Sequence, residues 1–330
     1  MLIMKNVAVI GAGITGITLA NLLQKKVNLT VYEKSRGVGG RMATRRAEPY
    51  QFNHGAQYFK IENKAFKDFL YPLIKNKIIK PWEAKHIEIF NKEVIKRVNI
   101  NNKIYYTAET KMNSVVKYLI NNSFSTKLLC KIMKIKKENN KWFIIDSDKI
   151  AYGPYDWIFV TIPPHQAIEI LNNNFKFLEI IKKIKMRSCY SLMLGFTKIN
   201  QFNFDTALFL DEDIKWLSID KKYYEKKEYY NLLINSSYDF AEKNINGLKD
   251  KIANYLIKQV SNIFNCELNN YEHKALHFWK YAMLENSNNL GSLIDENLKV
   301  TVCGDWCMNG KVEGGFLSAQ DAVSKFLKYI

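Results

Sequence analysis

The sequence lacks long apolar runs, and this absence excludes one large class of protein. No window approaches about eighteen uninterrupted apolar residues, the length that a transmembrane helix needs. The four residues before Lys5 are too few for the apolar core of a signal peptide. We therefore expect a cytoplasmic protein with no membrane partner.

Cysteines are also few, odd in number and scattered. With no export signal, free buried thiols are expected rather than disulfides. Cys303 and Cys307 are close in sequence, but no histidine stands near them to complete a zinc pattern, so no metal site is predicted. The five cysteines are Cys130, Cys189, Cys266, Cys303 and Cys307.

Positively charged residues outnumber negatively charged ones, but they do not form long continuous runs. The formal net charge is +17, yet the lysines are spread in short pieces such as Lys182-Lys183. Such an excess can attract anionic partners, or it can reflect a compositional bias toward Lys, Asn and Ile. The even spread favours the second interpretation, so we expect no nucleic-acid partner. The charge is also compatible with a second hypothesis, in which a basic entrance to the active site steers a phosphorylated substrate.

The start of the chain carries the pattern of a dinucleotide-binding βαβ unit. An apolar stretch at 6–10 leads into a glycine-rich turn, apolar residues then recur at helical spacing, and a second apolar stretch ends on Glu33. The first glycine allows a tight turn, the second lets the backbone approach a pyrophosphate, and the third lets the helix lie on the strand. The predicted cofactor-binding turn is Gly11, Ala12, Gly13, Ile14, Thr15 and Gly16.

Glu33 narrows the choice of dinucleotide. At the tip of the second strand its carboxylate can accept hydrogen bonds from both ribose hydroxyls, and its charge would repel a 2′-phosphate. FAD or NAD is therefore favoured over NADP. The helix that follows the turn offers unpaired N–H groups to the phosphates.

A second glycine-rich segment follows Glu33, where plain NAD dehydrogenases normally have a helix. Gly39 and Gly40 permit close backbone approach, and Arg41 can meet a pyrophosphate. The pattern G-G-R-x-x-T after a Rossmann acid resembles the FAD-containing amine oxidase and desaturase superfamily. The stretch E-K-S-R-G-V-G-G-R-M-A-T-R-R, followed by H-G-A-Q-Y-F, resembles the bacterial renalase branch of that superfamily. Asn53 departs from the Asp that those members usually carry.

The resemblance continues near the end of the chain. A strand at 298–302 leads to Gly304-Asp305, then a glycine-rich loop, and a helix is predicted from Phe316 onward. In such flavoproteins the Asp accepts a hydrogen bond from a ribityl hydroxyl, and the last helix points its N-terminus toward the flavin or the pyrophosphate. Two positions depart from the family, with Lys311 in place of Arg and Gly315 in place of Ala. The resemblance adds Lys34, Gln57, Glu313 and Gly314 to the predicted cofactor contacts.

These motifs predict an α/β fold of the p-hydroxybenzoate hydroxylase and amine oxidase type. A Rossmann-type FAD-binding domain is combined with a second, mixed-sheet (α+β) substrate domain. A three-stranded meander between about 131 and 152 is the crossover expected in such proteins. The predicted bounds are 1–60, 107–164 and 296–330 for the FAD-binding domain, and 61–106 and 165–295 for the substrate domain.

An aromatic-rich strand at 272–282 resembles the renalase stretch H-x-W-x-Y-A. Period-two alternation would place His277, Trp279 and Tyr281 on one face. That face is either part of an ordinary core or an aromatic wall for a planar substrate. Tyr58, from the H-G-A-Q-Y-F segment, joins these three as a substrate-cavity candidate.

The resemblance implies an FAD-dependent oxidoreductase, and specifically an oxidase with non-covalent FAD. No second G-x-G-x-x-G occurs in the chain, so the reductant must enter the flavin cavity itself. Renalase-like enzymes oxidise mis-reduced 2- and 6-dihydro-NAD(P) to NAD(P)+, with hydride transfer to flavin N5 and reduction of O2 to H2O2. Alternatives are an amine oxidase, a desaturase, or a non-catalytic FAD-binding protein, and covalent flavin through Cys307 is also conceivable. A monomer or homodimer is expected.

Overall fold

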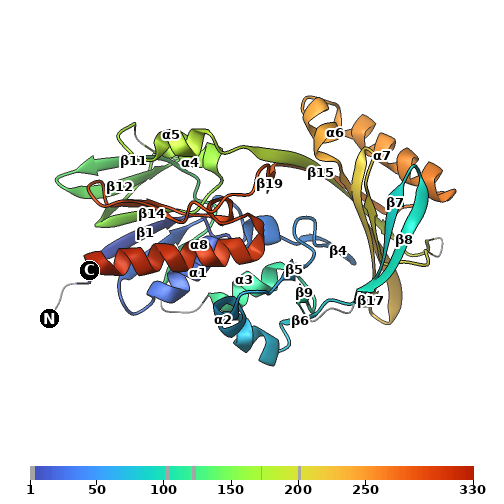
Figure 1. Cartoon of the computed structure of the whole chain (residues 1–330), viewed down its shortest axis with the longest axis horizontal. Coiled ribbons are helices and arrows are strands. Elements are labelled where there is room, and N and C mark those ends of the chain that lie inside the picture. The colour runs from blue at the N-terminus through green and yellow to red at the C-terminus, as the bar shows by residue number, and fades with distance from the viewer. Residues whose placement is uncertain (1–3, 101–103, 121–123, 172, 200–201) are drawn as a thin grey trace.

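The computed structural model describes residues 4–100, 104–120, 124–171, 173–199 and 202–330. Two lobes lie side by side, and the chain crosses between them several times (Figure 1). Residues 1–3, which belong to the short N-terminal segment that we expect not to be a signal peptide, lie outside the described ranges. Within those ranges no helix combines the length and the apolarity needed to cross a bilayer.

The first lobe is built on a six-stranded sheet that is parallel except at one edge. The strand order is β10-β2-β1-β14-β21-β20, and only β20 runs antiparallel to its neighbour. This order places strands from the beginning, middle and end of the chain side by side. They are β1 (Asn6–Ile10), β2 (Asn28–Tyr32), β10 (Ser125–Lys127), β14 (Trp157–Val160), β20 (Leu293–Asp295) and β21 (Val300–Val302).

Both faces of this sheet are buried, as expected for parallel strands. Val7 and Val9 pack into one core, and Ala8 and Ile10 pack into the other. The first core lies under α1 (Ile14–Leu23), α3 (Asn113–Leu119) and α8 (Lys311–Phe326), with the short η3 (Leu327–Tyr329) after α8. The second lies under the predicted meander and two helices, on the side of the sheet away from α1 and α8 (Figure 1). These elements are β11 (Ile132–Glu138), β12 (Lys141–Asp146), β13 (Ala151–Tyr155), α4 (Pro164–Ile170) and α5 (Leu178–Lys182).

The second lobe is a seven-stranded sheet in the order β19-β15-β18-β17-β16-β7-β8. It is antiparallel except where β16 runs parallel to β7. Helices α6 (Tyr238–Lys243) and α7 (Lys249–Phe264) pack on one face and share its core. The strands are β7 (Ala84–Phe90), β8 (Glu93–Ile100), β15 (Met186–Phe196), β16 (Thr206–Phe209), β17 (Ile214–Tyr224), β18 (Lys227–Ser236) and β19 (His273–Leu284).

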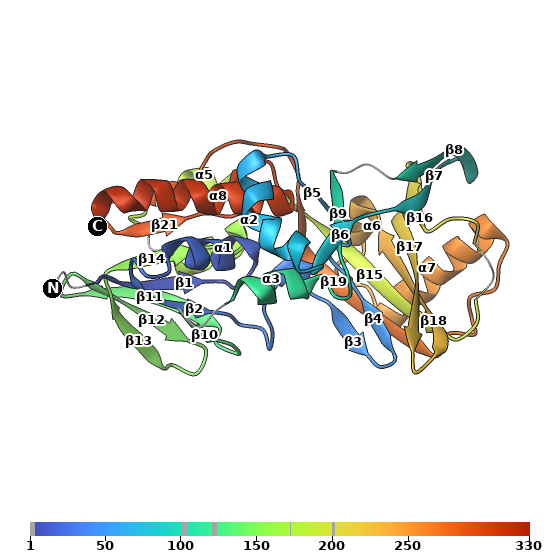
Figure 2. The ribbon, with the colours of Figure 1, turned by 90° about the horizontal axis from the view of Figure 1, so that it is seen from below.

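Shorter elements join the lobes. The hairpin of β3 (Arg45–Ala47) and β4 (Tyr50–Phe52) packs on the second sheet at Met193 and Leu233 (Figure 2). The helix α2 (Lys64–Lys75) packs in the first core instead, and its Phe66 ring lies 5.0 Å from that of Phe316. A small sheet pairs β5 (Phe59–Lys60), β9 (Tyr105–Ala108) and β6 (Ile79–Pro81).

The architecture confirms the predicted fold class, a Rossmann-type lobe beside a mixed-sheet lobe. The predicted domain bounds stay a prediction. Within the range 61–106, assigned as a whole to the second domain, α2 shares the core of the first lobe while β7 and β8 extend the second sheet.

The start of the last helix differs from its prediction. Helix α8 begins at Lys311 rather than Phe316, so the presumed glycine-rich loop forms its first turn. A Cβ at Gly314 would lie 2.1 Å from the Met308 carbonyl oxygen, and one at Gly315 would lie 2.8 Å from the Ile14 side chain. The glycines therefore allow close packing of a helix and do not interrupt it.

Candidate cofactor and substrate site

The first and third glycines of the turn after β1 are required by packing. Gly11 has φ +109°, and a Cβ there would lie 2.9 Å from the Thr161 hydroxyl oxygen. A Cβ at Gly16 would lie 2.0 Å from the Gly11 carbonyl oxygen, because α1 rests directly on the end of β1. The local geometry is that expected for a dinucleotide-binding turn.

Gly13 differs because nothing lies within 4 Å of the position its Cβ would take. It is the N-cap residue of α1, which has no side-chain cap and no acidic residue in its first turn. The first N–H groups of a helix need partners, and an anion can supply them. This open space beside an uncapped helix N-terminus fits a cofactor pyrophosphate.

The second glycine segment lies against the first. Gly39, with φ +120°, donates its N–H to the Ala12 carbonyl at 2.9 Å and forms an isolated bridge with Gly13. A Cβ at Gly40 would lie 3.5 Å from the Gly13 Cα. The two segments thus form one backbone cradle without side chains on the facing positions, which suits a phosphate.

Glu33 is buried at the base of this cradle. Its carboxylate accepts hydrogen bonds from the Ala12 N–H at 2.9 Å and from the Ser35 N–H at 2.8 Å. Each oxygen keeps a second lone pair for a ribose hydroxyl. The predicted ribose contact stays a prediction, and in this structure Glu33 holds the glycine turn in place. The neighbouring Lys34 is exposed.

Arg41 and Asp305, predicted to hold different parts of the cofactor, are joined to each other. The Arg41 Nη2 donates to the Asp305 Oδ1 at 2.5 Å, and Nη1 donates to the Ala282 carbonyl at 3.4 Å. A Cβ at Gly55 would lie 2.0 Å from the Arg41 carbonyl oxygen, so the H-G-A-Q segment runs directly beside Arg41. The three sequence motifs therefore meet at one place.

The side chains of two other predicted cofactor-binding residues form hydrogen bonds within the protein. The Glu313 carboxylate accepts from the N–H groups of Glu62 and Asn63, at 2.8 and 3.0 Å, just before α2. Gln57 accepts at its side-chain oxygen from the Trp216 indole N–H at 3.0 Å. Both side chains fix neighbouring elements, and their predicted roles stay predictions.

His277 and Trp279 come together with His54, a residue that the sequence did not single out for the site. Their ring centroids lie 4.3 Å apart, and the His54 ring lies 5.0 Å from each. The Trp279 indole N–H donates to the His54 carbonyl at 2.9 Å. A Cβ at Gly55 would lie 3.4 Å from the Trp279 ring, so this aromatic wall adjoins the Arg41 segment.

Burial keeps the histidines of the wall neutral. Desolvation, reinforced by His277, lowers the pKa of His54 from 6.5 to about 4. Desolvation also lowers the pKa of His277, assisted by Arg45 and Lys249. Together with Trp279, these residues form an aromatic and uncharged surface near neutral pH.

Tyr281 does not join this wall. Between Trp279 and Met283 the strand β19 carries three residues opposite the single residue Ser188, which breaks the period of two. Tyr281 stacks on His165 instead, with ring centroids 5.2 Å apart and planes at 18°. The period-two alternation predicted Tyr281 on the same face as His277 and Trp279. The sequence gives no clear signal for an irregularity of this kind, so the prediction could not allow for it.

Tyr58 belongs to a separate aromatic group. Its ring stacks on Trp82 at 4.1 Å with planes at 4°, and Trp216 lies 5.8 Å from it. The group draws on three separate parts of the chain, so the sequence alone did not reveal Trp82 or Trp216 as its members.

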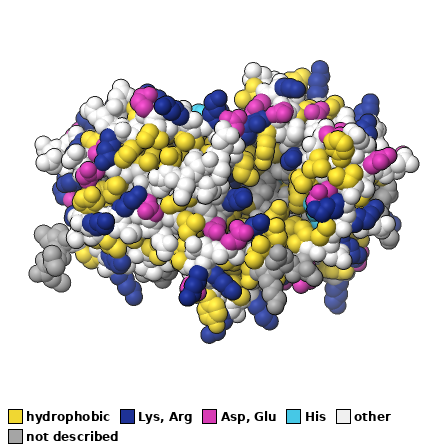
Figure 3. Space-filling model, viewed as in Figure 1, with side chains coloured by type: hydrophobic (Ala, Val, Ile, Leu, Met, Phe, Trp, Pro, Cys, Tyr) yellow, Lys and Arg dark blue, Asp and Glu magenta, His cyan; other side chains and the backbone are white. Residues whose placement is uncertain are grey.

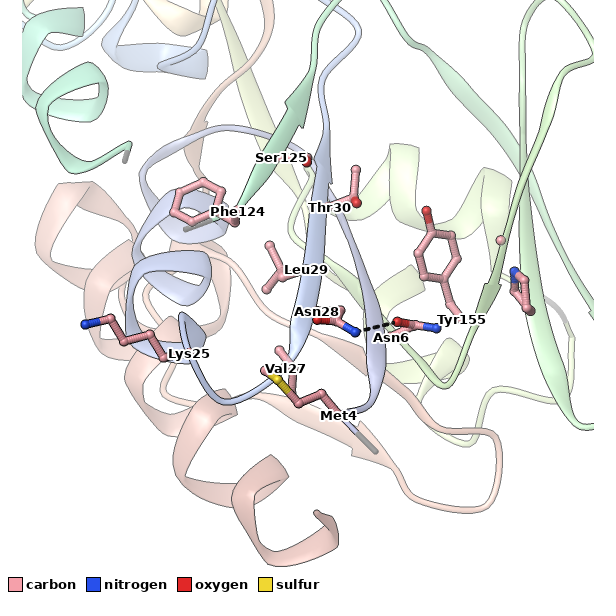
Figure 4. A pocket seen from close by; sticks show the side chains of 12 residues that line it. Met4, Asn6, Lys25, Val27, Asn28, Leu29, Thr30, Phe124, Ser125 and Tyr155 are labelled. Atoms are coloured by element: carbon pink, nitrogen blue, oxygen red, sulfur yellow. Dashed lines mark hydrogen bonds between the residues drawn. The ribbon is translucent and has the colours of Figure 1, made fainter. Parts of the chain in front are cut away.

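A hollow at the opposite end of the first sheet is not a candidate site. It encloses about 640 Å³ and is lined by residues such as Lys25, Asn28 and Tyr155 (Figure 4). It lies at the start of β1 and β2, where Asn28 donates to Asn6 at 3.1 Å. Ligands of open α/β sheets bind outside the carboxyl ends of the strands, where the glycine cradle lies.

Known proteins resemble this chain in sequence and fold. Residues 9–73 match the NAD(P)-binding Rossmann-like domain. The chain is 24% identical to mouse (Mus musculus) renalase over 351 residues, covering 98% of this chain and 99% of renalase. A protein from Exiguobacterium sp. 255-15 assigned as a protoporphyrinogen oxidase has a TM-score of 0.75 at 10% identity and covers 99% of both chains. An oxidoreductase from Methanosarcina mazei has a TM-score of 0.72 at 13% identity, covering 97% of this chain and 100% of its own.

The fold, the glycine cradle and these similarities together define an FAD-dependent oxidoreductase. Within that class the chain is a homologue of renalase over nearly its full length. The resemblance drawn from the G-G-R and H-G-A-Q segments is thereby confirmed.

Proposed function

We propose that this protein binds FAD non-covalently and oxidises dihydronicotinamide dinucleotides, the 2- and 6-dihydro isomers of NAD(P), to NAD(P)+. The aromatic wall of His54, His277 and Trp279 beside the cradle carries the proposal. The renalase similarity supports the same activity, since it extends over the whole chain.

Several features of the glycine cradle support FAD binding. The N-terminus of α1 and the backbone at Gly13 and Gly39 suit the pyrophosphate, and Glu33 keeps lone pairs for the adenosine ribose. When bound, FAD supplies a hydride acceptor at flavin N5 and passes the electron pair to O2, which is released as hydrogen peroxide. Cys307 is fully buried, and burial raises the pKa of its thiol well above the ordinary range, which argues against a covalent link.

The wall suits a planar dihydropyridine ring that loses a hydride. The ring is neutral before the transfer and positively charged after it, so a positive side chain beside it would oppose the reaction. His54 and His277 stay neutral near pH 7, and the face of Trp279 can attract the developing cation. An electron-rich dihydropyridine needs no protein base, so the protein's task is to orient the ring and exclude water.

The amine oxidase alternative is less well supported by the same geometry. An aromatic pair that frames an amine must leave room for the amine between its rings. Tyr58 and Trp82 are in direct contact at 4.1 Å and leave no such gap. The two rings pack against each other, with Trp216 beside them.

Anaerobic reduction of the bound flavin tests the proposal. The 2- and 6-dihydro isomers should bleach the flavin rapidly and yield NAD(P)+, whereas the 4-dihydro isomer and simple amines should react slowly. Admission of air should restore the flavin spectrum and release one peroxide for each substrate oxidised. Bleaching by amines alone would support an amine oxidase, and no bleaching by any donor would support a non-catalytic flavoprotein.

A further inference from the structure

A row of four side chains crosses the second sheet from the aromatic wall to the group around Tyr58. His277 on β19 is paired with Ser191 on β15, and Ser191 is paired with Asn235 on β18. Asn235 is paired in turn with Trp216 on β17. All these strands are antiparallel neighbours, and directly paired residues of such strands have their side chains on the same face. The row therefore begins at His277 and ends at Trp216, which lies beside Tyr58.

The row lies on the face of the sheet that is turned away from α6 and α7. On β18, Leu232 and Ile234 belong to the core that those helices share, so the side chain of Asn235 points to the other face. A hydrogen bond shows what covers that face: the Ser191 Oγ donates to the His54 carbonyl oxygen at 2.9 Å. Ser191 and Asn235 are thus short polar side chains between two aromatic groups.

The spacing of the row suits a planar ring. Neighbouring strands are about 4.8 Å apart, so the backbones of His277 and Asn235, two strands apart, are separated by roughly 10 Å. Only the small side chain of Ser191 lies between them in the row. A pyridine ring over Ser191 can contact the wall and still reach Asn235 with a substituent. His277, Asn235 and Trp216 are each partly exposed, so this part of the face is not sealed.

The hydrogen bonds of Asn235 fix the orientation of its terminal amide. The Ser191 hydroxyl has one hydrogen, which it gives to the His54 carbonyl, so it accepts from the Asn235 Nδ2 at 3.2 Å. The same Nδ2 lies 3.7 Å from the Cys189 Sγ. Oδ1 is therefore turned away from Ser191, and among the described residues it is buried with no hydrogen-bond partner. A buried acceptor without a donor is unfavourable until a donor is supplied.

We propose that Asn235 recognises the carboxamide of the substrate's pyridine ring. Its side-chain oxygen turns toward the ring and accepts a hydrogen bond from the carboxamide N–H, while the ring lies over Ser191 against His277 and Trp279. This inference rests on the proposed function and adds to it the residue that positions the ring. Asn235 and Ser191 are uncharged, so neither opposes the positive charge that the ring acquires when it loses a hydride.

The distribution of charge on the surface agrees with recognition by an uncharged group. On the face seen in Figure 3, Lys and Arg side chains are dispersed and interspersed with Asp and Glu. A dispersed excess of charge attracts anions weakly and without position. A hydrogen bond is directional and acts only at short range, so it can fix the ring where dispersed charge cannot.

Two ligands that differ only in the carboxamide test the proposal on the unaltered, FAD-loaded protein. In the 3-acetylpyridine analogue of NAD+ a methyl group replaces the NH2 group, so the carbonyl oxygen stays but no N–H can be donated. Binding of each ligand is measured from the change in the flavin spectrum. NAD+ should bind about ten-fold more tightly than the analogue, as expected for one hydrogen bond to a buried acceptor. Equal binding of the two ligands, or tighter binding of the analogue, would overturn the proposal.

A matched pair of variants assigns the preference to one residue. Asn235→Leu removes the acceptor, and Asn231→Leu is its control on the same strand and face. Asn231 is 4% exposed and accepts from the Gln51 N–H at 3.3 Å, so the hairpin β3–β4 covers it. Thermal unfolding shows whether each variant is folded, and Asn235→Ala replaces Asn235→Leu if the larger side chain is not accommodated.

Asn235→Leu should bind NAD+ and the analogue equally, each about ten-fold more weakly than the wild type binds NAD+. Asn231→Leu should keep the preference for NAD+. A preference that survives in Asn235→Leu or Asn235→Ala would overturn the assignment, even if dihydro-NAD isomers reduce the flavin and the proposed function stands. If no dihydro-NAD isomer reduces the flavin but the preference for NAD+ depends on Asn235, the function fails and the carboxamide site stands.

Discussion

Arg41 and Asp305 illustrate what single side chains contribute to this fold. Both come from glycine-rich motifs that the sequence makes easy to recognise, and each was predicted to contact a different part of FAD. The structure joins them by a hydrogen-bonded ion pair at 2.5 Å. The sequence predicted the residue types but not their mutual contact, because that contact depends on how two distant segments approach.

The pair gives a first prediction, concerning cofactor affinity. Arg41→Gln should raise the dissociation constant of FAD about ten-fold or more, since a charged donor is lost and the Asp305 carboxylate, 10% exposed, loses its partner. Titration of apoprotein, followed by FAD fluorescence, measures the change. Arg36→Gln, at an exposed position of the same loop, is the control and should bind FAD like the wild type. Equal weakening by both variants would contradict a specific role for Arg41.

His54 gives a prediction on pH and stability. Its pKa is about 4 in the folded state against 6.5 ordinarily, so between these values the unfolded chain binds more protons. Stability should therefore fall as pH drops from about 6.5 to about 4, with a contribution from this residue of up to about 3 kcal/mol. Urea unfolding at several pH values measures it.

The variant His54→Phe keeps a ring against Trp279 but cannot titrate. Between pH 6.5 and 4 it should lose less unfolding free energy than the wild type, by about the His54 contribution. Parallel stability curves for the two proteins would show that His54 is not held neutral by the fold.

At the scale of elements, sequence patterns identified the βαβ unit, the meander and the aromatic strand, because each has its own apolar period. They failed where packing overrides local preference. Glycines normally weaken a helix, yet α8 carries Gly314 and Gly315 as its fourth and fifth residues, because no larger side chain fits against Met308 and Ile14. The separation of Tyr281 from Trp279 likewise follows from an irregular pairing of β19 with β15.

The turn between β1 and α1 allows packing and binding to be tested separately. Gly13→Ala places a methyl group in open space at φ −74°, so thermal unfolding of the apoprotein should be unchanged while FAD affinity falls at least ten-fold.

Gly16→Ala should destabilise the apoprotein by about 3 kcal/mol, because its Cβ would meet the Gly11 carbonyl at 2.0 Å. Circular dichroism melts and FAD titration measure both effects. If Gly13→Ala bound FAD as tightly as the wild type, the pyrophosphate would not lie beside Gly13, and the prediction would be wrong.

On the scale of the whole molecule, the site is assembled from segments that are remote in sequence. The sequence indicated two discontinuous domains, but it did not reveal that α2 shares the first core or that Tyr58, Trp82 and Trp216 meet. Long-range contacts of this kind depend on the path of the chain between elements, which local patterns do not record.

A cofactor that touches several segments should stabilise the molecule as a whole. FAD at about one hundred times its dissociation constant should raise the free energy of unfolding by about 2.7 kcal/mol, since it binds only the folded chain. Thermal unfolding of the apoprotein with and without FAD, followed by tryptophan fluorescence, measures the shift. Gly13→Ala, at the same FAD concentration, should show a shift of about 1.4 kcal/mol or less, because its affinity is at least ten-fold weaker. Equal shifts for both proteins would mean that FAD does not bind at the cradle.

The sequence distance between Arg41 and Asp305 also has a consequence for biosynthesis. Their contact joins residues 264 positions apart, and β21, next to Asp305, completes the parallel strands beside β14. At roughly 5 to 20 residues per second, a ribosome adds the second partner some 15 to 50 seconds after the first. During that interval the glycine turn is already made, but the Gly304-Asp305 segment is not. If FAD binds as proposed, its capture follows translation of that segment, and a nascent chain shorter than this should emerge colourless.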